Sequence, residues 1–85
     1  MTPDFRTCTL TWGGGHGLQR ARERGVDPVD VESIVRGSTD LEPGYRGRWI
    51  AWGCIGGRRI KVVVQPVSPD RCIIVTIIRT GAPCI

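Results

Sequence analysis

The stretch RRIKVVVQPVSPDRCIIVTIIR, residues 58–79, decides the fold of this chain. Residues 58–65 alternate in polarity, and an extended chain sends alternate side chains to opposite sides. One side of this predicted strand is formed by Ile60, Val62 and Val64. Residues 71–79 are apolar at almost every position, which predicts a strand at the centre of a sheet.

The flanking segments add further strands and turns. Residues 48–54 predict a strand, and Gly56-Gly57 supplies the glycines of a hairpin turn that leads into the next one. Residues 5–12 are rich in β-branched and aromatic side chains and predict a strand near the N-terminus. We expect a polar loop at residues 38–47 and a loose tail at residues 81–85.

Two short helices are predicted between the first strand and the polar loop. The first runs from about His16 to Arg24 and ends before Gly25, a residue typical of helix ends. The second begins at Asp27-Pro28, with the aspartate as N-cap, and ends at Gly37.

This order of elements predicts an α+β fold. We expect two N-terminal helices packed on one face of a four-stranded antiparallel sheet. The chain has 85 residues, which allows one domain, so we expect a single domain over residues 1–85 with its core between about residues 9 and 80.

The charge balance favours an anionic partner. The formal net charge is +4, and Lys61 is the only lysine, so arginine carries almost all of the positive charge. Arginine binds phosphate through a planar, two-pronged set of donors. Nucleic acid is therefore the first partner to consider and an acidic protein the second, although the charge also serves solubility.

The cysteines and the single histidine argue against a metal site. Cys8, Cys54, Cys72 and Cys84 form no C-x-x-C pair. Two of them lie in or beside apolar strand patterns, so we favour reduced thiols over disulfides. With no signal peptide and no apolar run long enough for a bilayer, we expect a cytoplasmic protein without a membrane partner. No glycine-rich nucleotide-binding motif is complete, so we expect no cofactor.

The first helix carries the residues best suited to phosphate chemistry. His16, Arg20 and Arg24 are spaced four residues apart and share one helix face. Imidazole titrates near neutral pH, and guanidinium binds phosphate oxygens in pairs. The alternative is an ordinary solvated face with acidic partners nearby.

The pattern H-x-x-x-R-x-x-x-R-G-[VI]-x-x-x-[DE]-V starts at His16 and is followed by Gly56-Gly57, by Lys61 to Val64 and by Ile73 to Ile78. Together these segments resemble a family of small bacterial domains allied to RelE, ParE and BrnT-like toxins and to C-terminal domains of polymorphic toxins. The resemblance implies the barnase–EndoU–colicin–RelE-like fold and a metal-independent endoribonuclease. It also implies a neutralising antitoxin or immunity protein as partner.

Cleavage of RNA without metal needs a base, an acid and cations that stabilise the charged phosphorane. We expect His16 to act as base or acid and Arg20 to hold the phosphorane. Lys61 is either a second proton carrier or an electrostatic clamp. Thr76 and Arg79 are expected to reach the same cleft, although each also has a purely structural explanation.

Other arginines are candidates for contact with the RNA backbone. These residues are Arg24, Arg46, Arg48, Arg58 and Arg59, and we expect the last four to cluster at one end of a hairpin. Trp49 and Trp52 lie on opposite faces of their predicted strand, and the one outside the core could stack on a base.

Two other functions stay open at this point. The chain could be a basic module that binds RNA or an acidic protein without cleaving anything. It could also be a ParE-like toxin that inhibits a protein target. The sequence further leaves open whether the domain stands alone or is delivered into a target cell as part of a larger toxin.

Overall fold

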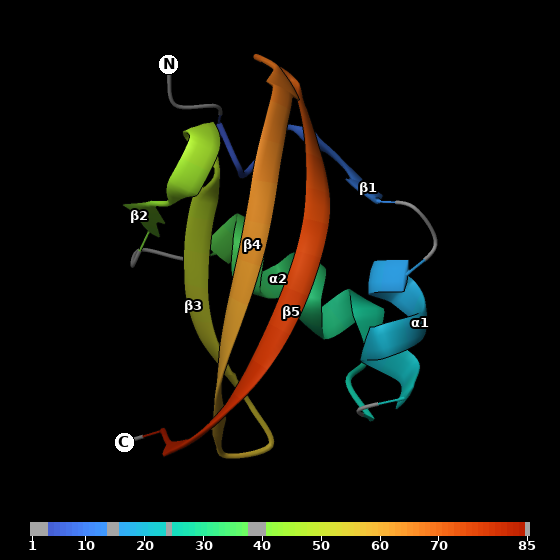
Figure 1. Ribbon diagram of the computed structural model, residues 1–85, viewed down its shortest axis with the longest axis vertical. Coiled ribbons are helices and arrows are strands. Elements are labelled where there is room, and N and C mark those ends of the chain that lie inside the picture. The colour runs from blue at the N-terminus through green and yellow to red at the C-terminus, as the bar shows by residue number, and fades with distance from the viewer. Residues whose placement is uncertain (1–3, 14–15, 24, 38–40, 85) are drawn as a thin grey trace.

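A computed structural model describes residues 4–13, 16–23, 25–37 and 41–84, with the backbone alone at His16, Gly17 and Arg20. Its five strands form one sheet in the order β1-β5-β4-β3-β2. β1 is parallel to β5, and every other neighbouring pair is antiparallel (Figure 1). The strands are β1 (Thr9–Trp12), β2 (Leu41–Pro43), β3 (Trp49–Ile55), β4 (Arg58–Ser68) and β5 (Arg71–Pro83).

The strand pair β4–β5 is the centre of the sheet, as the sequence predicts. Ile60, Val62 and Val64 are almost fully buried on one side of β4, which confirms the alternation read from the sequence. The turn between β3 and β4 has positive φ angles at both Gly56 (60°) and Gly57 (78°). Side chains other than glycine rarely adopt this backbone conformation, so the glycine pair makes the tight hairpin possible.

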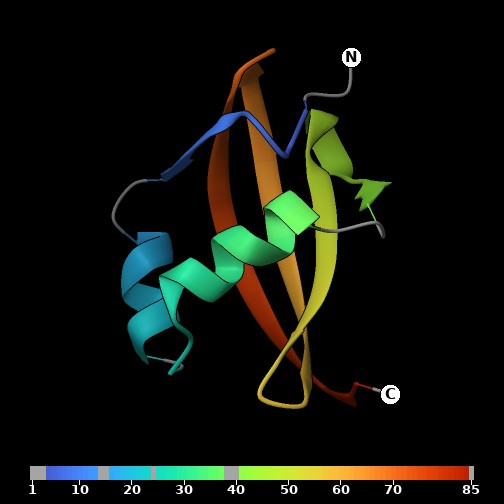
Figure 2. The same ribbon diagram turned by 180° about the vertical axis from the view of Figure 1, so that it is seen from behind.

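Two helices, α1 (His16–Glu23) and α2 (Pro28–Gly37), follow β1. The side chain of Asp27 accepts a hydrogen bond from the backbone N–H of Val29 at 2.9 Å, which caps α2 as predicted. Val31 and Val35 of α2 have no exposed surface and pack into the core on one face of the sheet. α2 crosses this face, whereas α1 lies beside the edge of β5 (Figure 2).

One glycine allows α2 to approach β3 closely. A Cβ atom added at Gly53 would lie 2.5 Å from Cγ1 of Ile34 on α2. A side chain at this position of β3 would therefore push α2 away from the strand. The core between helix and sheet is completed by buried side chains from the N-terminal segment, α1, β3, β4 and β5, and Leu10 and Trp12 of β1 pack against it partly buried.

The predicted fold class is wrong. The sheet has five strands and is mixed, because β1 runs parallel to β5 and β2 adds a strand inside the predicted polar loop. Pro43 has no backbone N–H to donate. It is compatible with β2 because that strand lies at the edge of the sheet, where no further strand requires a donor.

The path of α2 explains why β1 and β2 lie at opposite edges of the sheet. α2 has ten residues. It therefore rises about 15 Å, enough to cross about three strands spaced about 4.8 Å apart. The chain leaves β1 at one edge of the sheet, crosses one face as α2 and enters β2 at the opposite edge. Only α2 crosses the face of the sheet, and α1 lies beside β5. The two helices are therefore not packed side by side on this face, contrary to the prediction.

The expectation of reduced cysteines is wrong for Cys54 and Cys84 and correct for Cys8 and Cys72. The expectation of a loose tail is wrong for residues 81–84, and residue 85 lies outside the described residues. Cys54 and Cys84 form a disulfide, and β5 continues to Pro83. The backbone N–H of Cys84 also donates to the carbonyl oxygen of Gly57 at 3.1 Å. Cys8 and Cys72 are free thiols in the core. Among the described residues, no helix is long and apolar enough to cross a membrane.

Candidate functional site

Neither α-helix of the described part of the chain covers the face of the sheet opposite α2, and we call this the open face (Figure 1). Ile60, Val62 and Val64 point toward α2, so the alternate residues of β4 point to the open face. Cross-strand pairing then places side chains in rows across β3, β4 and β5. One row is Trp52, Lys61 and Ile78, and the next is Ile50, Val63 and Thr76.

Trp52 is the centre of a cluster of charged groups on this face. The guanidinium carbon of Arg59 lies 4.5 Å from the centroid of the Trp52 ring, and Nζ of Lys61 lies 5.9 Å from it. Cations at such distances are attracted to the negative face of the ring. The indole Nε1 of Trp52 donates a hydrogen bond to Oε1 of Glu42 on β2 at 3.2 Å.

A cavity of about 360 Å³ lies over this cluster, and we call it the tryptophan pocket. Its lining residues are Glu42, Trp52, Arg59, Thr80 and Ala82. Trp52 and Glu42 come from β3 and β2, whereas Thr80 and Ala82 come from the last part of β5. The pocket therefore depends on the position of the C-terminal end of the sheet.

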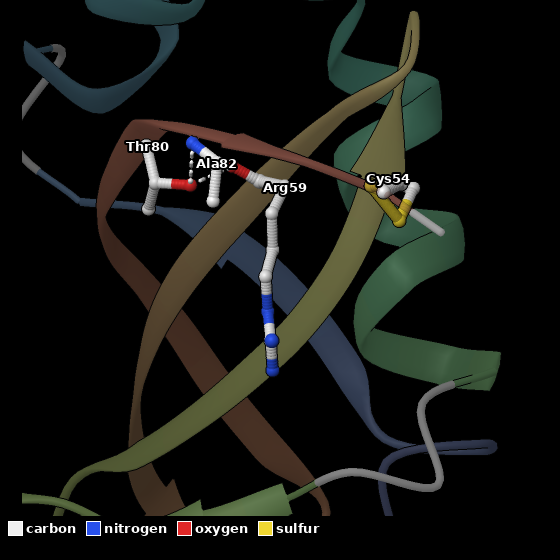
Figure 3. The surroundings of a disulfide bond; sticks show 5 residues. Cys54, Arg59, Thr80 and Ala82 are labelled. Atoms are coloured by element: carbon white, nitrogen blue, oxygen red, sulfur yellow. Dashed lines mark hydrogen bonds between the residues drawn. A yellow bond between two sulfur atoms is a disulfide. The ribbon is translucent and has the colours of Figure 1, made fainter.

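Hydrogen bonds and the disulfide hold that end of β5 in place (Figure 3). The hydroxyl of Thr80 donates to the carbonyl oxygen of Arg59 at 2.9 Å and accepts from the N–H of Ala82 at 3.3 Å. The disulfide joins Cys84 to Cys54 on β3. β3, β4 and β5 are thus fastened to one another beside the pocket.

The structure brings two of the predicted catalytic residues to the open face. Lys61 pairs with Ile78, and Thr76 pairs with Val63, so Lys61 and Thr76 are diagonal neighbours on adjacent strands. The Cβ atoms of such neighbours lie about 7–8 Å apart. Thr76 reaches this face because of a register shift, since Val63 pairs with Thr76 whereas Val64 pairs with Ile74.

Arg79 lies on the other face. It pairs with Ile60, and paired residues point to the same side of a sheet, so its exposed side chain is on the side that carries α2. The structure therefore does not bring Arg79 together with Lys61 and Thr76.

The central predictions for α1 concern side chains that the structure does not describe. For His16 and Arg20 the structure describes the backbone alone, and Arg24 lies outside the described residues. The backbone of α1 lies beside β5. The roles predicted for these three residues stay predictions.

The four remaining arginines do not form one cluster, contrary to the expectation. β3 and β4 are antiparallel, with Trp49 opposite Val64 and Ile55 opposite Arg58. Arg46 and Arg48, which precede β3, thus lie at the opposite end of the hairpin from Arg58 and Arg59. Nε of Arg48 donates to Oε1 of Gln65 at 3.2 Å, which holds Arg48 at the far end of the open face.

The other two arginines make local contacts. The guanidinium of Arg46 lies 5.2 Å from the ring centroid of Tyr45. Arg58 donates from Nη1 to the carbonyl oxygen of Gly81 at 3.5 Å. Arg58 and Arg59 are both exposed at the start of β4, but only Arg59 lines the tryptophan pocket. Arg58 alternates with Arg59 along the strand, so its side chain starts from the side of the sheet that carries α2.

Sequence reasoning missed the part that Glu42 plays in the site. Glu42 falls in the predicted polar loop, and no motif marks it. Only the pairing of β2 with β3, in which Glu42 lies opposite Ile50, carries the carboxylate to Trp52.

A larger cavity, of about 500 Å³, lies between α2 and the end of β3. Trp52 lines this cavity as well, but none of the residues predicted for catalysis and none of the arginines predicted for RNA binding does. In the part of the chain that the structure describes, no group of three or more histidine, cysteine, aspartate or glutamate residues could hold a metal ion.

A family model matches residues 14–79, and it is described as a domain of unknown function (DUF4258). The chain belongs to this family. The DUF4258 match includes both helices and all of the residues predicted for catalysis. It ends before Thr80, Ala82 and Cys84, so one wall of the tryptophan pocket and half of the disulfide lie beyond the match. No curated protein and no solved structure gives a match to the chain.

Proposed function

We propose that this domain binds single-stranded RNA on the open face and cleaves it as a metal-independent endoribonuclease of the toxin type. The observation that carries the proposal is the cluster of Arg59 and Lys61 around the ring of Trp52 on an uncovered sheet face. An antitoxin or immunity protein would neutralise the enzyme, which acts in the cytoplasm of the cell that contains the RNA.

The chemistry of the cluster suits RNA better than it suits a folded protein. Unpaired bases stack on aromatic rings and on guanidinium planes, and nearby cations bind the phosphates. Lys61 and Arg59 supply these cations within one hairpin, and Arg48 extends the charge to the other end of the face. The net charge of +4 adds a general attraction for the RNA backbone.

Cleavage is the part of the proposal that rests on the resemblance to RelE-like toxins. In that mechanism His16 takes the proton from the 2′-hydroxyl, and the resulting 2′-oxygen attacks the phosphorus. Arg20 stabilises the charge on the phosphorane, and Lys61, as clamp and second proton carrier, gives a proton to the 5′-oxygen that leaves, so the products are a 2′,3′-cyclic phosphate and a 5′-hydroxyl. The neighbouring positions of Lys61 and Thr76 support a phosphate site on the open face.

The proposal is tested by incubating the purified protein with labelled RNA in the presence of EDTA. We expect cleavage, and we expect His16→Ala to lose most of it while RNA binding is retained. Lys61→Ala is expected to weaken both binding and cleavage. Arg22→Ala is the matched control, because it removes one exposed charge from α1 at a residue with no predicted role in catalysis or RNA binding. RNA that stays intact at micromolar protein would refute the catalytic proposal.

A second candidate function is RNA binding without cleavage. One specific observation favours it: Arg79, which was expected to help at the cleft, lies on the face opposite Lys61 and Thr76. Salt-dependent RNA binding without cleavage, unchanged by His16→Ala, would support this second function over the first.

A further inference from the structure

The tryptophan pocket contains a carboxylate as well as cations, and the carboxylate is held in one orientation. Glu42 lies on the edge strand β2, and the indole N–H of Trp52 donates to its Oε1. A carboxylate has two oxygens with about four acceptor positions. One hydrogen bond from Trp52 therefore fixes the group and leaves acceptor positions for a ligand.

The carboxylate of Glu42 determines which part of a nucleotide can enter this pocket. A phosphate group would be repelled by Glu42, whereas a group with N–H donors would be attracted to it. The cations Arg59 and Lys61 lie on the same face and suit the phosphates of the same molecule. A site with this combination of charges fits a nucleotide whose base enters the pocket and whose phosphates stay outside.

We infer that the tryptophan pocket is a nucleobase subsite that selects guanine through Glu42. This inference rests on the proposed binding of RNA. Guanine presents two adjacent donors, N1–H and the 2-amino group, on its Watson–Crick edge, and a carboxylate accepts both at once. Adenine, cytosine and uracil each place an acceptor where guanine has one of these donors. RNA-binding proteins read the edges of unstacked bases in this way.

The other walls of the pocket suit the face of a base. The guanidinium of Arg59 already lies over the ring of Trp52 at 4.5 Å. A base placed against the guanidinium extends this stack by one layer. The cavity of about 360 Å³ falls in the range of about 300–1,000 Å³ that is common for small-ligand sites.

The test compares binding of short labelled oligouridylates that carry one central guanine, adenine or cytosine, with all-uridine RNA as reference. The oligonucleotides are 2′-O-methylated, so that the protein cannot cleave them, and binding is measured by fluorescence anisotropy. We expect wild-type protein to prefer the guanine oligonucleotide by about fivefold to 100-fold, the range of a good bidentate contact to a base.

Glu42→Gln is expected to remove this preference while binding to all-uridine RNA stays equal or becomes stronger, because a negative charge is lost. Trp52→Phe keeps an aromatic ring, although a smaller one, and removes the N–H that orients the carboxylate, so it is expected to reduce the preference. Glu32→Gln on α2 is the matched control, because it removes one carboxylate on the opposite side of the sheet. This control is expected to keep the guanine preference.

The outcomes separate this inference from the proposed function. Equal binding of all four oligonucleotides by the wild type overturns the guanine subsite and leaves RNA binding intact. A guanine preference that survives Glu42→Gln overturns it as well. Failure to bind any of the oligonucleotides overturns the proposed function, and the subsite with it. Glu42 is exposed, so thermal unfolding is expected to show that Glu42→Gln folds as the wild type does.

Discussion

Trp52 and Trp49 are three residues apart on β3, and their surroundings differ. Trp49 packs against Phe5 with its ring edge-on, the two centroids 6.5 Å apart, beside the buried core. Trp52 instead contacts two cations and one carboxylate on the open face. Trp49 therefore contributes to the stability of the core, whereas Trp52 lies among charged groups on the open face.

Trp52→Ala is expected to weaken binding of single-stranded RNA by about fivefold to 100-fold, since a stacked base contributes about 1–3 kcal/mol. The melting temperature is expected to change less than in Trp49→Ala, which removes a ring packed against the core. Fluorescence anisotropy and thermal unfolding of the two variants check this pair of expectations. A larger loss of RNA binding in Trp49→Ala than in Trp52→Ala would contradict the assignment.

Cys72 gives the protein a dependence on alkaline pH. Burial raises the pKa of the Cys72 thiol from 9.0 to about 12, and a hydrogen bond with Cys8 adds to the shift. The unfolded chain loses this proton at lower pH than the folded one, so stability is complete below about pH 9 and falls as pH rises toward 12. Urea unfolding of the wild type and Cys72→Ala at pH 8 and pH 11 measures the difference. We expect the wild type to lose more stability than the variant over this interval, and an equal loss would contradict the assignment.

At the level of elements, the strands that could be predicted are those whose side chains alternate or are buried on both faces. β3, β4, β5 and the capped helix α2 follow from such local patterns. β2 does not, because three residues that include Pro43 have too little pattern to indicate a strand. The parallel pairing of β1 with β5 could not be predicted from such patterns either, since hydrophobic periodicity does not reveal the direction of the neighbouring strand.

The candidate site shows the same limit. The alternation of β4 places Lys61 on the open face and could be read from the sequence. A regular β5 would turn Thr76 to the same side as the buried Ile74, and only the bulge between the two turns Thr76 outward. Glu42 depends on β2, and the disulfide depends on the path of β5, so neither followed from the spacing of residues.

The end of β5 is the element whose attachment is easiest to change. The disulfide closes a loop with a sequence separation of 30 residues. A disulfide that closes a loop of this size stabilises the folded protein by about 3–4 kcal/mol. We expect reduction, or the pair Cys54→Ala and Cys84→Ala, to lower the free energy of unfolding by up to this amount.

Loss of the disulfide is also expected to weaken RNA binding, because Thr80 and Ala82 form one wall of the tryptophan pocket. Denaturant unfolding and RNA titration with and without reducing agent check both effects. In the doubly substituted protein the reducing agent should change nothing. Unaltered affinity for RNA after complete reduction would show that the end of β5 does not shape the binding face.

At the scale of the whole molecule, the sheet separates stability from binding. The face under α2 holds the buried core, and the open face carries Arg48, Arg59 and Lys61 along its length with apolar side chains between them. Such a face can tolerate substitution of its cations without losing the core. Charge variants on it should therefore fold normally and report on binding alone.

The dependence of RNA binding on salt follows from this layout. If Arg48, Arg59 and Lys61 each neutralise one phosphate, the logarithm of the association constant falls with the logarithm of salt concentration with a slope of about −2. Raising the salt from about 50 mM to about 200 mM then weakens binding by about 20-fold. Lys61→Ala is expected to make the slope shallower by about 0.7, whereas Arg22→Ala on α1 leaves it unchanged. A slope that responds equally to the two substitutions would place the RNA elsewhere than on the open face, because only Lys61 projects from that side of the sheet.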